Sequence, residues 1–390
     1  MKKLFSIFVF FFLFVPLIAE MEISKNIKAS IAILDELKRQ IEETHPALYT
    51  KITKEEFETK IETLKKVWNK QDEMQKYFSL RHLVALIGDA HTQIFKQIEN
   101  DKVLPFFALP YGGHSIIVQT DEAYKELVGK ELIAINGMKI KTIFQKLFPI
   151  ISHDTEGWAY LNAHYEARLF SRLKYIGAIK KGESASIKIK DIATGKTQTI
   201  KVNFSSNMQI NSPHFANLSP TLFQSGYYRA NILEDILFIQ YNVCQNFPEM
   251  PMKEFAFRVS QLPKSKKIIV DLRHNTGGDS TVIEPLLEVL KDFIKDGSSV
   301  FTLVGNGTFS SGVMSAHSLK EIGAIVVGEQ MGWNGKFGEV KEIELPDAFT
   351  LFCSTKDFSQ NIQDPDIMMM QDTKDLNAGL DTLVEAIKKL

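Results

Sequence analysis

The chain has 390 residues, of which 44% are apolar and 24% are charged, as in ordinary globular proteins. This composition excludes a disordered tail, a collagen-like fibre and a multi-span membrane protein. The 46 basic and 47 acidic side chains give a net charge of −1, so we expect no attraction to nucleic acid. Only two cysteines occur, Cys244 and Cys353, which excludes a disulfide framework and a cysteine-based zinc site.

The first nineteen residues have the layout of a secretory signal peptide. Lys2 and Lys3 are followed by a largely apolar run over 4–18, and Ala19 is small enough to precede a cleavage site. The alternative is a membrane anchor, for which the run is short of the roughly 20 residues that span a bilayer. We therefore expect residues 1–19 to be removed and the mature protein to be exported, periplasmic or secreted, without stable membrane insertion.

Residues 20–98 have the three- and four-residue apolar spacing of amphipathic helices. Thr53 and Glu56 are spaced as a capping box, which opens a helix. A later helix is expected to end at Gly88, because glycine commonly follows the last helical turn. The sequence Asp-Ala-His-Thr at 89–92 comes directly after it. The pattern predicts an N-terminal helical domain.

Residues 99–203 change to short strands and turns. Asn136 and Gly137 lie between two short apolar runs, which predicts a tight hairpin. A helix-like stretch over 155–173 separates this hairpin from a second strand pair over 184–202. Two interpretations stay open for this β-rich region: a module that binds an extended peptide along a sheet edge, or a structural spacer.

Residues 204–390 include a region, from about 230, in which strands and helices alternate. The alternation predicts an α/β layer with right-handed crossovers, in which ligands bind at the carboxyl ends of the strands. The expected strands cover 232–241, 267–272, 300–304 and 324–327, and the expected helices cover 281–294 and 311–322.

The loop over 271–278 leaves a buried strand and enters a helix. Its paired glycines, Gly277 and Gly278, allow a sharp turn and present bare N–H groups to an anion or a developing oxyanion. A tight structural turn is the alternative interpretation. Neither phosphate-loop pattern, GxGxxG or GxxxxGK[ST], is present. Asp271 and Arg273 are interpreted as a structural pair at the end of the sheet.

A second loop places Ser310 at the start of the helix expected over 311–322. A serine there exposes its Oγ, and the N–H of Ser311 points toward any oxyanion that forms nearby. This is the logic of a nucleophile elbow without the GxSxG sequence. The alternative is a helix cap, since serine is a favoured N-cap residue.

Five short segments, each weak alone, carry a specific signal in combination. They are 83–92 (Leu-Val-Ala-Leu-Ile-Gly-Asp-Ala-His-Thr), 129–137, 270–278, 308–312 and 327–329. In this order they resemble the S41 serine peptidase family, which includes the tail-specific (C-terminal processing) proteases and the tricorn protease core. The resemblance covers nearly the whole mature chain.

The resemblance implies a multidomain α+β and α/β fold. Its parts are an N-terminal helical bundle over 20–98, a PDZ-like β module over 99–203 and a ClpP/crotonase-type α/β catalytic domain over 204–390. It also implies hydrolysis of peptide bonds in protein or peptide substrates, with no metal and no cofactor.

The resemblance also implies site residues. Ser310 matches the family nucleophile, the backbone N–H of Ser311 lies in the oxyanion hole, and Gly277 or Gly278 provides the second N–H. A serine hydroxyl needs an adjacent base, and the family uses either a histidine or a lysine. His91 matches the first type and Lys336 is near the position of the second.

We favour His91 because the sequence after Lys336 continues Phe-Gly-Glu, as in the histidine type. The chain departs from the tricorn-like pattern in two ways. Ala90 stands where a serine precedes the histidine, and no glutamate matches the one that supports it. Asp89 and Asp357 are candidates to orient the histidine.

The function predicted from the sequence is an exported serine peptidase. The alternative is an exported protein that keeps the fold without catalysis and binds peptides or small apolar ligands. The departures around His91 favour this alternative, whereas Ser310, His91 and the glycine pair favour the enzyme.

Overall fold

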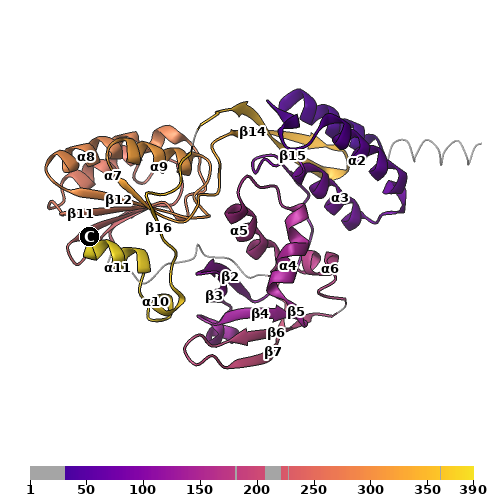
Figure 1. Ribbon diagram of the computed structural model, residues 1–390, viewed down its shortest axis with the longest axis horizontal. Coiled ribbons are helices and arrows are strands. Elements are labelled where there is room, and N and C mark those ends of the chain that lie inside the picture. The colour runs from indigo at the N-terminus through magenta and orange to yellow at the C-terminus, as the bar shows by residue number, and fades with distance from the viewer. Residues whose placement is uncertain (1–30, 181, 207–220, 227, 361) are drawn as a thin grey trace, which may run out of the picture.

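The computed structural model describes residues 31–390 except 181, 207–220, 227 and 361. The predicted signal peptide, residues 1–19, lies outside the described residues. Figure 1 shows three parts around three sheets: N-terminal helices, an antiparallel sheet with its own helices, and a mixed sheet covered by helices. Within the described ranges, no helix is both long enough and apolar enough to cross a bilayer.

The N-terminal part is helical, as its apolar spacing predicts. Its elements are a helix over 31–44, α2 (Lys54–Val67) and α3 (Glu73–Ala85), with short 3-10 turns η1 (Leu48–Thr50) and η2 (Trp68–Lys70). The capping box is confirmed: the Thr53 side chain accepts from the N–H of Glu56, whose carboxylate accepts from the N–H of Thr53. Phe57, Ile61 and Trp68 are buried in the core between the helices.

A hairpin from near the C-terminus completes this helical part. Strands β14 (Phe337–Leu345) and β15 (Phe349–Asp357) form a three-stranded antiparallel sheet with β1 (Gln93–Phe95). Figure 1 shows the yellow-orange hairpin against the indigo helices α2 and α3. Leu351 and Cys353 are buried in the same core as the helices. The hairpin falls within residues 204–390, which were assigned to the catalytic domain from the sequence, but it contributes to the core of the N-terminal part.

The middle part is an antiparallel sheet with the order β2-β3-β4-β6-β7, in which β5 also pairs with β4. The strands are β2 (Phe106–Tyr111), β3 (His114–Thr120), β4 (Glu131–Ile135), β5 (Met138–Lys139), β6 (Ser184–Lys190) and β7 (Thr197–Asn203). The helices are α4 (Ile140–Leu147), α5 (Glu156–Glu166) and α6 (Phe170–Tyr175), with 3-10 turns η3 (Glu122–Leu127) and η4 (Phe148–Ile150). The hairpin at Asn136 and Gly137 is confirmed, and both residues have the positive φ that its tight turn requires.

The C-terminal part is a seven-stranded mixed sheet with the order β16-β13-β12-β11-β10-β9-β8. The strands are β8 (Thr221–Ser225), β9 (Tyr228–Leu233), β10 (Ile236–Tyr241), β11 (Lys267–Asp271), β12 (Ser299–Val304), β13 (Ile325–Gly328) and β16 (Ile367–Met368). From β10 to β16 neighbouring strands are parallel, as the alternating pattern predicts. The strand expected over 232–241 is instead two antiparallel strands, because Glu234 adopts a positive φ and turns the chain.

Helices cover both faces of this sheet, because successive strand residues point to opposite faces. The helices on this sheet are α7 (Met252–Ser260), α8 (Glu284–Lys295), α9 (Ser311–Glu321) and α11 (Thr382–Lys389), with the 3-10 turn η5 (Ser280–Ile283). The short helix α10 (Thr373–Asn377) packs Leu376 against β2 and β3, and the 3-10 turn η6 (Pro346–Ala348) joins β14 to β15. On β10, Leu237 shares a core with α7, α8 and α9, whereas Phe238 packs with α11. The mixed α/β fold class is thereby confirmed, while the division at 98 and 203 stays a prediction.

Candidate active site

Ser310 lies in the loop between β12 and α9, in a backbone conformation that serine rarely adopts. Its φ is 52° and its ψ is −127°. A non-glycine residue with positive φ is strained, and such strain gathers at functional sites. Ser310 occupies the N-cap position, but its side chain makes no capping hydrogen bond. The helix-cap interpretation is therefore wrong, and the hydroxyl is not used to start the helix.

The glycine loop packs directly against Ser310. A Cβ on Gly277 would lie 2.7 Å from the Cβ of Ser310, so only glycine permits this approach. The Gly277 N–H donates to Asn275 Oδ1 at 2.9 Å, and the Asp279 N–H donates to the carbonyl of Cys244 at 2.7 Å. Gly278 lies between these two engaged groups and faces the same cleft as Ser310. The geometry thus favours Gly278 over Gly277 as the second oxyanion donor.

Ser310 and His91 line one cleft of about 470 Å³, together with Gly278 and Ser311. The other lining residues are Asp279, Ser280, Met314, Trp333, Gly338, Glu339, Val340, Lys356 and Phe358. Four segments that are distant in sequence therefore meet here: the loop after α3, the loop after β11, the loop after β12 and the β14–β15 hairpin. Lys336 is not among the lining residues, and its Nζ lies 4.8 Å from the ring centroid of Phe337.

The His91 ring is held between aromatic side chains. It stacks on Phe309 with ring centroids 4.4 Å apart and meets Trp333 edge to face at 5.7 Å. Within the described residues, neither ring nitrogen has a hydrogen-bond partner, and Nδ1 lies 3.9 Å from Asp89 Oδ1. Burial lowers the pKa of His91 below its usual 6.5, and the charge of Asp89 opposes this shift. The imidazole is therefore neutral at pH 7, as a general base must be.

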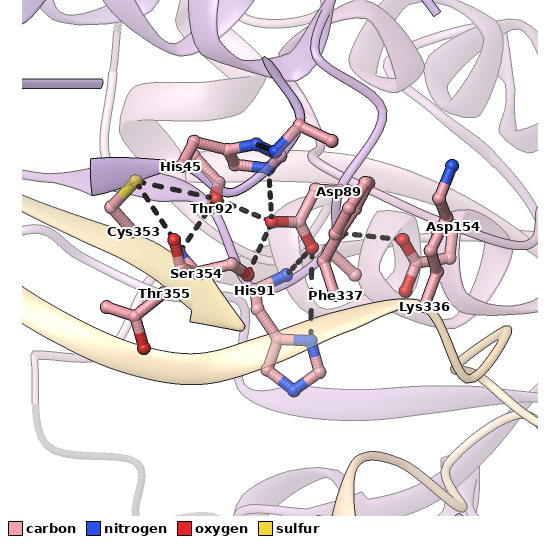
Figure 2. Close-up of polar contacts among 12 residues, drawn as sticks. His45, Asp89, His91, Thr92, Asp154, Lys336, Phe337, Cys353, Ser354 and Thr355 are labelled. Carbon is pink, nitrogen blue, oxygen red and sulfur yellow. Dashed lines mark hydrogen bonds and ion pairs between the residues drawn. The ribbon is translucent and has the colours of Figure 1, made fainter. Parts of the chain in front are cut away.

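Asp89 is fully buried beneath His91, and hydrogen bonds fix its carboxylate (Figure 2). Oδ2 accepts from the hydroxyls of Thr92 at 2.5 Å and Ser354 at 2.6 Å, and His45 Nε2 lies 3.3 Å away. Oδ1 accepts the backbone N–H of His91 at 2.9 Å. Burial alone would raise the pKa of Asp89, but these hydrogen bonds outweigh it and hold the pKa below the usual value. Asp89 is therefore an ionised carboxylate next to His91.

Two of these partners, His45 and Ser354, were missed by sequence reasoning. His45 lies at the end of the helix over 31–44, and Ser354 lies on β15. The Ala47 N–H donates to His45 Nδ1 at 3.2 Å, so the proton on Nε2 is the one directed at Asp89. No local pattern marks either residue. Asp357, the other candidate to orient the base, instead accepts from the N–H and hydroxyl of Ser359 and does not line the cleft.

Asp154 is the second carboxyl group near His91. Its Oδ1 accepts the N–H of Ala90 at 3.1 Å, and its buried Oδ2 has no hydrogen-bond partner within the described residues. Burial and the nearby charge of Asp89 raise its pKa to about 7. Ligand atoms of Asp89, His91 and Asp154 lie within 4.8 Å of one another. Asp89 in this trio already accepts three hydrogen bonds, which leaves few of its lone pairs free for a metal ion.

We expect Asp154→Asn to stabilise the protein more at pH 8 than at pH 5. A carboxyl group whose pKa is raised by folding destabilises the native state as pH rises from its unfolded value, near 4, through about 7. The substitution removes that cost, which a shift of this size sets on the order of 4 kcal/mol at pH 8 and which is only partly present at pH 5. Urea unfolding at both pH values measures it. An equal change in unfolding free energy at pH 5 and pH 8 would contradict the assignment.

The remaining predicted residues are structural. Arg273 forms a two-point ion pair with Asp271, at 2.9 and 2.8 Å, and its Nη2 also contacts Asp381 at 2.6 Å. This confirms the pair predicted at the end of the sheet. Cys244 and Cys353 are buried free thiols in different cores.

Comparisons with known proteins place the fold. No protein-family model matches the chain, and no curated protein matches it. Among solved structures, mature CPAF in complex with lactacystin is 14% identical and has a TM-score of 0.71, covering 93% of this chain and 97% of that chain. A second structure of mature CPAF is also 14% identical, with a TM-score of 0.70 over 93% and 96% of the two chains.

A further similar structure is that of the photosystem II D1 C-terminal processing protease. It is 12% identical, has a TM-score of 0.42 and covers 87% of this chain and 93% of that chain. At these identities, the likeness to CPAF shows the fold. The chain has an S41-like peptidase fold, and the resemblance noted in the sequence is confirmed at that level.

Proposed function

We propose that this chain is an exported serine peptidase that hydrolyses peptide bonds in protein or peptide substrates. One observation carries the proposal: a strained serine with a hydroxyl that caps no helix shares a cleft with a buried, neutral histidine. The likeness to CPAF supports it, since one CPAF structure is a complex with lactacystin and another is an S499A mutant. Residues 20–98, 99–203 and 204–390 form its helical, PDZ-like and catalytic domains.

In the proposed mechanism, Ser310 Oγ attacks the carbonyl carbon of the scissile peptide bond. His91 takes the hydroxyl proton and later gives it to the leaving amine. Asp89 stabilises the imidazolium that forms between these steps, because it is ionised and lies 3.9 Å from Nδ1. The N–H groups of Ser311 and Gly278 hold the oxyanion of the tetrahedral intermediate. Neither ring nitrogen of His91 has a hydrogen-bond partner in the described residues. We therefore expect the hydrogen bond between His91 and Ser310 to form only when substrate is bound.

The proposal predicts that an aryl fluorophosphonate labels Ser310 covalently. Fluoride leaves as the serine oxygen bonds to phosphorus, and the reaction needs the same activated hydroxyl as peptide hydrolysis. We expect stoichiometric modification of the chain from Glu20, located at Ser310 by peptide mass mapping, and cleavage of a mixed peptide library by the unlabelled protein.

Ser318, on the same helix, serves as an internal control and should stay unmodified. Absence of both labelling and cleavage, with the fold intact by circular dichroism, would contradict the peptidase. That result would support the alternative, an exported binding protein with the same fold.

A further inference from the structure

A second cavity of about 620 Å³ shares no lining residue with the Ser310 cleft. One side is formed by the end of β2 and by α5. The other side is formed by residues that directly follow β10, β11, β12, β13 and β16, all at the carboxyl ends of parallel strands. This is the edge at which open α/β sheets bind ligands, and the volume is within the range of ligand sites. We call it the Glu329 cavity.

The cavity wall is largely apolar, and two successive aromatic contacts connect it to the proposed catalytic residues. Leu161 and Tyr165 of α5 and Leu383 of α11 contribute to the wall. Trp158, also in the wall, stacks on Phe309 with ring centroids 4.0 Å apart. Phe309 precedes Ser310 and stacks in turn on His91. The rings of Trp158 and Phe309 therefore separate an occupant of the cavity from His91.

Charges in the cavity favour a cation. Glu329, the first residue after β13, lines the cavity, and its carboxylate makes no hydrogen bond or ion pair within the described residues. Arg273 is the only lysine or arginine in the lining, and it is already paired with Asp271 and Asp381. One guanidinium thus faces three carboxylates. His274 adds no charge at pH 7, because burial lowers its pKa to about 4.

The ionised Glu329 carboxylate has lost part of its hydration in the cavity, and none of the described side chains there compensates that free-energy cost by pairing with it. Burial raises the pKa of Glu329 above its usual value, and the charge of Arg273 only partly opposes this. A cationic group placed on Glu329 would compensate the lost hydration, whereas a carboxylate would meet net negative charge. A ligand that matches the cavity therefore combines an apolar body with one positive charge.

We propose that the Glu329 cavity binds an apolar peptide segment through a basic side chain, with its ammonium or guanidinium on the Glu329 carboxylate. This rests on the proposed function, because a peptide is the substrate class of that activity. The proposal adds a substrate preference: peptides with a basic residue flanked by apolar residues should bind, and peptides that place an acidic group in the cavity should bind poorly.

Binding is measured by calorimetry in Ser310→Ala protein, so that no turnover is needed. The probes are three capped peptides, acetyl-Phe-Xaa-Phe-amide with lysine, norleucine or glutamate at the centre. We expect the lysine peptide to bind at least about tenfold more tightly than the norleucine peptide, and the glutamate peptide to bind most weakly. In the double variant Ser310→Ala/Glu329→Gln, the lysine and norleucine peptides should bind with equal affinity.

Glu321→Gln is the matched control, since Glu321 is an exposed carboxylate on α9 outside the cavity. It should leave all three affinities unchanged. The three peptides are compared in protein that retains Glu329, so this comparison remains valid even if Glu329→Gln fails to fold. Equal binding of the three peptides, tightest binding of the glutamate peptide, or no binding of any would overturn the proposal. Failure of Ser310 to react would instead overturn the peptidase and leave this binding result intact.

Discussion

Ser310→Ala is expected to lower kcat/KM for a cleaved peptide by about 10⁴-fold or more. Without the hydroxyl no acyl-enzyme forms, and the oxyanion donors alone give little rate enhancement. The measurement is mass-spectrometric cleavage of a library-derived peptide by the chain from Glu20. The fold should be preserved, because the Ser310 side chain caps no helix. Substrate affinity is therefore expected to change little.

Ser318→Ala is the matched control for this prediction, because Ser318 lies on the same helix, α9, outside the cleft. It should retain full activity. Cleavage that persists in Ser310→Ala at the unaltered rate would assign the hydrolysis to another group or to a contaminant.

His91→Ala is expected to reduce kcat/KM by about 10³-fold or more, whereas Lys336→Ala should stay within about twofold. His91 lines the cleft with Ser310 and has an ionised carboxylate behind it, but Lys336 lies outside the lining residues. In the unsubstituted enzyme, kcat/KM should rise with pH to a plateau, and the midpoint of the rise should lie below pH 6.5. The sign follows because burial lowers the pKa of His91 and only the neutral imidazole accepts the serine proton.

The two substitutions discriminate between the bases that the family resemblance left open. A large loss in Lys336→Ala with full activity in His91→Ala would assign the base to the lysine. A midpoint well above 6.5 would also contradict a buried histidine base. Circular dichroism of His91→Ala is needed beside the kinetics, because its ring packs against Phe309 and Trp333.

The identity of the base shows how far local pattern reaches. His91 follows Gly88 and Asp89, and that short motif was sufficient to nominate it. Lys336 was proposed as the alternative because it lies near the position of the lysine in the family members that use a lysine base. Position along the chain leaves open which way a side chain points, and Lys336 is not among the residues that line the Ser310 cleft.

The sequence alone determined the features that depend on nearby residues. The capping box at Thr53, the hairpin turn at Asn136 and the parallel strands of the α/β sheet each follow from a few neighbouring side chains. The clustering of Ser310 with the glycine loop also follows, because adjacent parallel strands end at the same sheet edge.

Tertiary structure alone decided what surrounds the histidine. Ser354 contacts Asp89 across 265 positions of sequence, because it lies on the β14–β15 hairpin, which pairs with β1. The preference for Gly278 over Gly277 depends on the hydrogen bond that the Gly277 N–H donates to Asn275 Oδ1, and the Glu329 cavity forms only where five strand ends meet α5. Such contacts join residues whose local sequences carry no shared signal, because their proximity arises from the packing of whole elements.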